Sequence, residues 1–229
     1  MSVTDLSSIT DYVALTAAYQ DQLNALAELV GEQVAEQFRA LDHLDRADVP
    51  AFVESSQAIV RAGQGEAIDL TSAWLAEVNG KPVARDLIDL RELAPEWERP
   101  FQVHWHELKH GQPWETARES GAGRAHELGF DSARAGAHKR MGSSKLKTVG
   151  YRRVPNATAC DWCQVVAIQR YHSAESASLS GQHKKCKCAV VAIFGHNDPG
   201  RTLAKQRLKE LKASGAVSRV SAAGARSRK

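Results

Sequence analysis

Apolar side chains recur every three or four residues along the first forty positions of the chain. Between Ile9 and Leu41 this spacing places one continuous apolar stripe on a helix, formed by Leu15, Tyr19, Leu23, Leu26, Val30, Val34, Phe38 and Leu41. No proline interrupts the stretch, and Gly31 is its only glycine. A helix of roughly 30 residues is about 45 Å long at ~1.5 Å per residue, so we expect it to pack along a second helix of the chain or along a partner.

The next residues predict two shorter helices. Asp48 before Pro50 marks a helix start, with Gly63 near the end of that helix. A third helix is expected over Glu66–Val78, ending at the turn signal Asn79-Gly80-Lys81-Pro82. Together with the long first helix, these segments predict an antiparallel bundle.

Further helices are expected up to about residue 135. The stretch from Val83 to Leu93 fits either a helix or an extended chain. A short helix should follow Pro100 and run through His110, and another should start at Trp114 and weaken at Gly121 and Gly123. Residues 1–135 therefore form a predicted α-helical region.

The pattern changes in the last third of the chain. Residues 150–155 form a short extended segment, Cys163 to Arg170 fit one or two helical turns, and the apolar run from Ala189 to Phe194 is typical of a strand. We therefore expect a mainly α protein with a small α+β domain at 136–198 and, at 199–229, a short helix followed by a basic, partly disordered tail. So small a domain has little apolar core, and a metal would help to stabilise it.

Charge divides the chain in the same place. The net charge of +3 hides 22 acidic and 10 basic residues in 1–130, net −12, and 5 acidic and 20 basic residues in 131–229, net +15. This asymmetry predicts two different partners, the basic part facing a polyanion such as nucleic acid. No apolar run reaches the ~18 to 20 residues of a membrane span, and no signal peptide is apparent, so we expect a protein made in a reducing cytoplasm without membrane contact.

All four cysteines lie in the basic part, and the first 159 residues contain none. A C-x-x-C pair is followed, after a 19-residue spacer, by an H-x-x-C-x-C group; the candidate metal ligands are Cys160, Cys163, His183, Cys186 and Cys188. Two ligand pairs separated by a loop are the usual layout of a tetrahedral structural zinc site. We expect one structural zinc, held by Cys160, Cys163 and two of the other three.

Two other interpretations of the cysteines stay open. They could form a metal-free core held by packing, or by disulfides in an oxidised particle. A zinc deaminase also carries C-x-x-C, but the H-x-E element that supplies a ligand and the general base is missing from this sequence.

His106-Glu107-Leu108-Lys109-His110 matches the H-E-x-x-H pattern of zinc proteases, in which the histidines bind Zn²⁺ and the glutamate activates water. Gly111 and Pro113 follow at once, and Thr116 stands where the extended pattern has a third histidine. The alternative is a solvated helix face with Trp105 and Leu108 packed inward. We expect no enzyme; a capsid maturation zinc protease using this motif is the rival hypothesis.

The segment from 150 to 194 combines several features, namely Gly150-Tyr151-Arg152-Arg153-Val154-Pro155, Cys160, Cys163, Tyr171, His183, Cys186, Cys188, Val190, Val191 and Phe194. As a set they resemble the C-terminal region of phage Mu F-like minor head (capsid morphogenesis) proteins, most of all the version encoded beside the portal gene in tailed phages of actinobacteria. Residues 111–117 also resemble that family's loop into a helix. The chain departs from the usual form of that family at Asp161-Trp162, Lys184-Lys185 and Lys187. These departures alter the charge of the segment but none of the candidate ligands.

This resemblance implies a virion protein present in few copies, at the portal vertex or in the capsid interior. Its partners would be the portal protein, the major capsid protein or scaffold, and packaged double-stranded DNA, in head assembly, DNA packaging or ejection. The helical region 1–135 would then be the part that docks on the portal or capsid. Some proteins of this kind are described as capsid maturation proteases, but this chain shows no catalytic constellation.

The tail is also basic. From His196 to the end there are 9 basic and 2 acidic residues, net +7. We expect non-specific, salt-dependent contact with DNA phosphates through Lys205, Arg207, Lys209, Lys212, Arg219, Arg226, Arg228 and Lys229. No aromatic residues interleave there to stack bases. A solvated tail without partner, and a stand-alone DNA-binding zinc module, are the alternatives.

Overall fold

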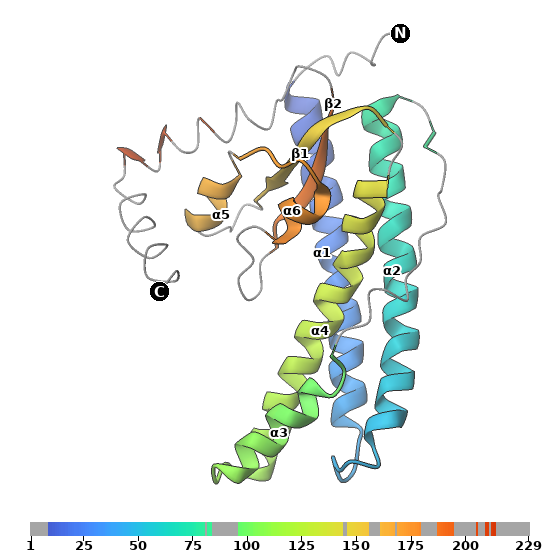
Figure 1. The fold of residues 1–229 in the computed structure, drawn as a ribbon, viewed down its shortest axis with the longest axis vertical. Helices are drawn as coiled ribbons and strands as arrows, with labels where there is room; N and C mark the ends of the chain where they lie inside the picture. Colours follow the sequence, from blue (N-terminus) through green and yellow to red (C-terminus); the bar gives the residue numbers. More distant parts are fainter. Residues whose placement is uncertain are drawn as a thin grey trace. The chain divides into compact units, whose positions relative to one another are not determined.

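The computed structural model describes residues 9–80, 82–83, 96–143, 146–155, 161–167, 169–179, 187–194, 205, 209–210 and 212–213. The protein is mainly helical, with one small two-stranded sheet (Figure 1). The elements are α1 (Ile9–Arg39), α2 (Val49–Asn79), α3 (Arg99–Lys109), α4 (Trp114–Ser143), β1 (Thr148–Val154), α5 (Asp161–Val166), α6 (Ala174–Leu179) and β2 (Ala189–Phe194). None of the helices described is long and apolar enough to cross a membrane.

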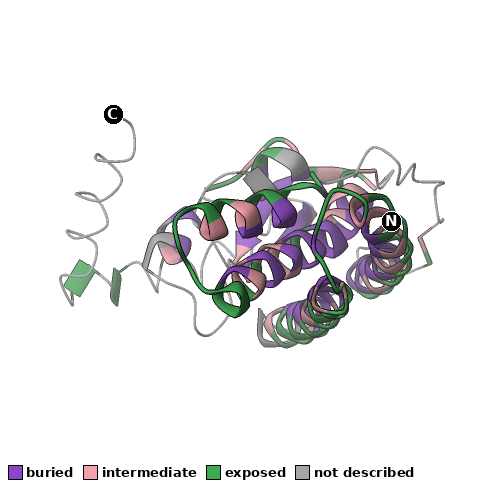
Figure 2. Cartoon of the chain, turned by 90° about the horizontal axis from the view of Figure 1, so that it is seen from below, coloured by how far each residue is buried: buried purple, intermediate pink, exposed green. Residues whose placement is uncertain are grey.

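The long first helix predicted from the apolar spacing is confirmed. Helix α1 begins at Ile9 and ends at Arg39, within two residues of the predicted end. Its stripe supplies buried side chains along most of its length, among them Leu23, Val34 and Phe38. Figure 2 shows the same one-sided burial along the long helices.

The prediction of two helices between residues 48 and 78 is wrong, because α2 runs unbroken through Gly63 and Gly65. Gly63 lies against α1, where an added Cβ would meet Val30 Cγ2 at 2.4 Å. The glycine therefore permits close helix packing and does not end a helix. Glycine inside a helix is unfavourable because its backbone loses more conformational entropy on folding than that of other residues. A glycine that is present for close packing therefore resembles, in the sequence, a glycine that ends a helix.

The expected weakening of the helix that starts at Trp114 is also wrong. Helix α4 continues from Trp114 through Gly121 and Gly123 to Ser143. Gly121 is buried, and an added Cβ there would meet the Phe38 ring at 2.5 Å. The short α3 has Pro100 in its first turn, as expected. The ambiguous stretch from Val83 to Leu93 falls, apart from Val83, outside the described residues.

Contacts divide the chain into two compact units that interleave along the sequence. The first unit comprises residues 1–20, 73–86 and 138–229, and the second comprises 21–72 and 87–137. The sequence-based domain boundaries 1–135, 136–198 and 199–229 stay a prediction. In the second unit, the rings of Phe38, Phe52 and Phe101 meet edge to face at 5.1 to 5.5 Å between centroids and form the centre of the core.

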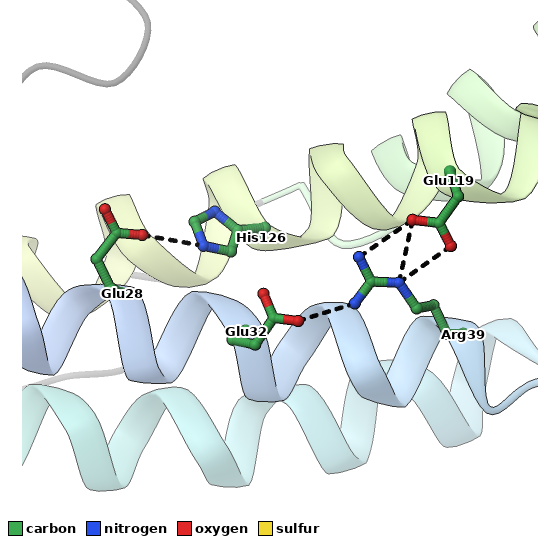
Figure 3. Close-up of polar contacts among 5 residues, drawn as sticks. All are labelled: Glu28, Glu32, Arg39, Glu119 and His126. Carbon is green, nitrogen blue, oxygen red and sulfur yellow. Dashed lines mark hydrogen bonds and ion pairs between the residues drawn. The ribbon is translucent and has the colours of Figure 1, made fainter.

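Polar contacts join α1 to α4 within the second unit (Figure 3). Arg39 Nε lies 3.1 Å from Glu119 Oε1, and Arg39 Nη1 lies 3.0 Å from Glu32 Oε1. One turn further along the contact, His126 Nε2 lies 3.2 Å from Glu28 Oε2. Two of these pairs, Arg39–Glu119 and His126–Glu28, link the two helices at partly exposed positions, and Arg39–Glu32 lies within α1.

The first unit contains the sheet. Strands β1 and β2 pair antiparallel, with Val154 opposite Ala189 and Thr148 opposite Phe194. Both strands are largely buried, and α6 packs on each of them. The extended segment predicted around 150–155 and the strand predicted at Ala189–Phe194 are confirmed, the latter to the residue.

Candidate metal centre

The fold brings two of the five predicted metal ligands together. Cys163 lies on α5, and Cys188 directly precedes β2. Their side chains are 1 % and 3 % exposed and pack in one cluster. Each cysteine comes from a different one of the two predicted ligand groups, so the sheet has placed the groups beside each other.

The other three candidates, Cys160, His183 and Cys186, lie outside the described residues. For two of them, chain length limits the distance from the described cysteines. Cys160 is three residues from Cys163, a span of at most about 11 Å, and Cys186 is two residues from Cys188, at most about 7 Å. Within the described part of the chain, no group of three His, Cys, Asp or Glu side chains forms a metal site.

The donors present fit zinc. Two buried thiols, one on α5 and one just before β2, offer soft ligands, which as thiolates favour zinc among the common divalent ions. A buried thiolate without a metal or another positive partner is costly, and binding a cation removes that cost. Cys160 together with one of His183 and Cys186 would complete a tetrahedral set.

Buried arginines of β1 hold the segments around the cysteines. Arg152, 2 % exposed, donates from Nη1 to the carbonyl of Ala167 at 2.5 Å, just beyond the end of α5. A cation at a helix C-terminus compensates the carbonyls that lack helical partners. Arg153 Nη1 donates to the carbonyl of Ala177 in α6 at 3.2 Å. The arginine pair of the 150–155 motif therefore anchors α5 and α6 to the sheet.

Tyr171, in the spacer between the two ligand groups, lies beside β1. Its N–H donates to the Tyr151 carbonyl at 2.9 Å, and the Tyr151 N–H donates to the Tyr171 carbonyl at 2.8 Å. An added Cβ on Gly150 would lie 2.9 Å from the Tyr171 oxygen. The glycine, the tyrosine and the strand of the motif thus belong to one local arrangement.

The structure also describes both histidines of the H-E-x-x-H match. His106 and His110 are exposed, and their rings stack at 4.1 Å between centroids. His110 Nδ1 lies 2.8 Å from the carbonyl oxygen of His106, and α3 ends at Lys109. Trp105 packs against the core and donates from Nε1 to the Leu44 carbonyl at 2.8 Å. Of the ring nitrogens of these two histidines, Nδ1 of His110 therefore faces the backbone.

Only part of the predicted DNA-contacting set can be placed. Lys205, Lys209 and Lys212 are exposed and helical. Arg207, Arg219, Arg226, Arg228 and Lys229 lie outside the described residues.

Sequence analysis missed one buried polar residue of the first unit. Gln20 is 3 % exposed and donates hydrogen bonds to the backbone at Val154, before the first cysteine group, and at Lys187, within the second. The available signal was the polar series Thr16, Gln20 and Asn24, spaced by four residues on one face of the first helix and buried in the structure.

A model of the VG15 protein family matches residues 11–211. The chain belongs to this family. VG15 is a phage-like viral protein family, so this is a phage protein. No curated protein and no solved structure matches the chain. The VG15 match covers nearly all described residues and the whole cysteine segment.

Proposed function

We propose that this VG15 protein is a minor head protein of a tailed phage, similar to the Mu F-like head morphogenesis proteins. It binds the portal protein or the inner face of the capsid and acts in head assembly, DNA packaging or ejection. Membership of a phage family supports association with the virion. The motifs of residues 150–194 support the finer assignment, and they lie inside the matched range.

The burial of Cys163 against Cys188 carries the structural side of this proposal. Catalytic zinc sites keep one position open to water, whereas structural sites are closed by protein ligands. Two nearly inaccessible thiols fit a closed site. The metal centre then stabilises a small basic module in an assembly protein.

The surface of the second unit supports a protein partner. Its helices α1 and α2 expose acidic side chains along their length, namely Asp21, Glu32, Glu36, Glu54, Glu66 and Asp69. A surface of this charge repels DNA phosphates and complements a basic protein surface. The exposed lysines at 205, 209 and 212 suit the opposite role, non-specific contact with packaged DNA.

Co-expression of the tagged full chain with the portal and major capsid proteins encoded alongside it tests the proposal. We expect the chain to co-purify with portal rings or shells after nuclease treatment, and imaging to place it at the portal vertex or the inner shell. Absence from assembled particles would contradict the proposal. Tight, salt-sensitive DNA binding without any portal or capsid association would favour the DNA-binding zinc module.

The protease hypothesis has its own test. Glu107→Gln removes the group that would activate water while keeping the side-chain size. We expect normal processing of the capsid protein in particles assembled with this variant. Loss of processing in a folded variant would establish the protease instead.

A further inference from the structure

Gln20 makes two hydrogen bonds that connect distant parts of the first unit. Its Nε2 donates to the carbonyl oxygen of Val154 at 2.9 Å and to that of Lys187 at 2.8 Å. A side-chain amide nitrogen has two hydrogens, so this geometry uses both donors. The two acceptors are 134 and 167 positions away in sequence.

The two acceptor carbonyls lie at the same end of the sheet, where β1 ends and just before β2 begins. Val154 is the last residue of β1, before the chain continues to Cys160. Lys187 lies between Cys186 and Cys188, and β2 starts at Ala189, directly opposite Val154 in the ladder. Gln20 therefore joins the backbones of both segments at the end of the strand pairing.

We infer that Gln20 is a positioning residue for the metal centre, an inference that rests on the proposed zinc site. By holding the Val154 and Lys187 carbonyls together, it keeps the two ligand groups close before metal binds. Less conformational entropy is then lost when the ligands close around the ion. Residues that orient ligands from outside the coordination shell typically change metal affinity by about 10- to 100-fold.

Two substitutions of Gln20 separate hydrogen bonding from packing. Gln20→Met keeps the length of the side chain and removes both donors. Gln20→Glu is nearly the same shape but places a carboxylate against two carbonyl oxygens. Gln22→Ala is the matched control, because Gln22 is exposed on the same helix.

The experiment measures zinc affinity of the full chain by competition with a chromogenic chelator. It also measures hydrogen exchange of the amides at 187–190 in the metal-free protein. We expect both Gln20 variants to bind zinc about 10- to 100-fold more weakly and to exchange faster at these amides. Gln22→Ala should match the parent in both measurements.

Failure of the inference and failure of the zinc proposal give different results. A parent protein that binds no zinc overturns the metal centre itself. A parent that binds zinc, with unchanged affinity in both folded variants, overturns the role of Gln20 alone. Unfolding of Gln20→Glu leaves Gln20→Met to decide. Unfolding of both would overturn the inference as well, because Gln20 would then be required for the fold and not for the metal centre.

Discussion

Cys163 and Cys188 lie 25 positions apart in the sequence and pack against each other in the first unit, each almost fully buried. The antiparallel pairing of β1 with β2 produces this contact, because it returns the chain from the second ligand group to the place where the first group began. The two cysteine groups, separate in the sequence, thereby meet through Cys163 and Cys188.

The first prediction concerns the metal content. Elemental analysis of the purified full chain should give about one zinc per chain, and Cys163→Ser should lower both the zinc content and the thermal stability, since structural zinc contributes directly to folding free energy. Less than a tenth of a zinc per chain, together with a Cys160→Ser variant as stable as the parent, would refute the site.

A matched histidine pair sharpens this test. His183→Ala removes a candidate ligand, whereas His172→Ala removes an exposed histidine of the spacer. If His183 is the fourth ligand, only its replacement weakens zinc binding. Equal affinity in both variants would assign the four positions to the cysteines.

The second prediction concerns close packing of helix α4. An added Cβ at Gly136 would lie 2.8 Å from the backbone oxygen of Gln64, which cannot move without disturbing α2. Gly136→Ala should therefore lower the free energy of unfolding by about 1 to 3 kcal/mol. Gly123 meets nothing within 4 Å, so Gly123→Ala should raise it by about 0.5 to 1 kcal/mol through helix propensity. Urea unfolding of the two variants measures both effects, and changes of the same sign would contradict the explanation.

Glycines within the helices also show why some elements could be predicted from the sequence and others could not. The periodic stripe of α1 and the apolar run of β2 are local patterns, and both elements were predicted closely. Gly63 and Gly121 resemble helix breakers in sequence because their role is to accommodate Val30 and Phe38 on another helix. Local propensity does not contain that contact.

Some features of the candidate site could likewise be predicted from the sequence, and others could not. The spacing of the cysteines predicted that the two ligand groups come together, with Cys188 as one of three candidates beside His183 and Cys186. The structure packs Cys163 of the first group against Cys188 of the second. Gln20 could not be found by spacing. Its role depends on two backbone carbonyls more than 130 positions away, and a glutamine on a predicted helix is most often a surface residue.

The third prediction concerns pH. His104 is fully buried, with its ring edge-on to Trp114 at 4.7 Å, and burial lowers its pKa from the usual value near 6.5. Above that value both the folded and the unfolded protein hold the neutral ring. As the pH falls below it, the unfolded protein takes up a proton that the folded protein resists, so stability is lost.

Replacing this histidine should remove that loss. We expect His104→Phe to flatten the fall in unfolding free energy between pH 7 and pH 5, relative to the parent, by no more than about 1.4 kcal/mol per pH unit, the limit for one proton. Gln102→Ala, at an exposed position of the same helix and without a titratable group, is the control and should leave the slope unchanged. A parent and a His104→Phe variant with parallel pH profiles would show that His104 does not contribute.

The fourth prediction concerns the ion pair between α1 and α4. Arg39 donates to both carboxylate oxygens of Glu119, from Nε at 3.1 Å to Oε1 and from Nη2 at 3.1 Å to Oε2, and this pairing raises the pKa of Arg39. The Arg39 side chain is one third exposed and that of Glu119 more than half, so solvent screens much of the attraction. A double-mutant cycle of Arg39→Gln and Glu119→Gln should give a coupling energy of at most about 1 kcal/mol, and it should shrink as salt is raised. Arg46→Gln, at an exposed arginine of the turn before α2, should show no coupling to Glu119→Gln. A coupling that persists in high salt would mean that the pair is shielded from water, contrary to its exposure.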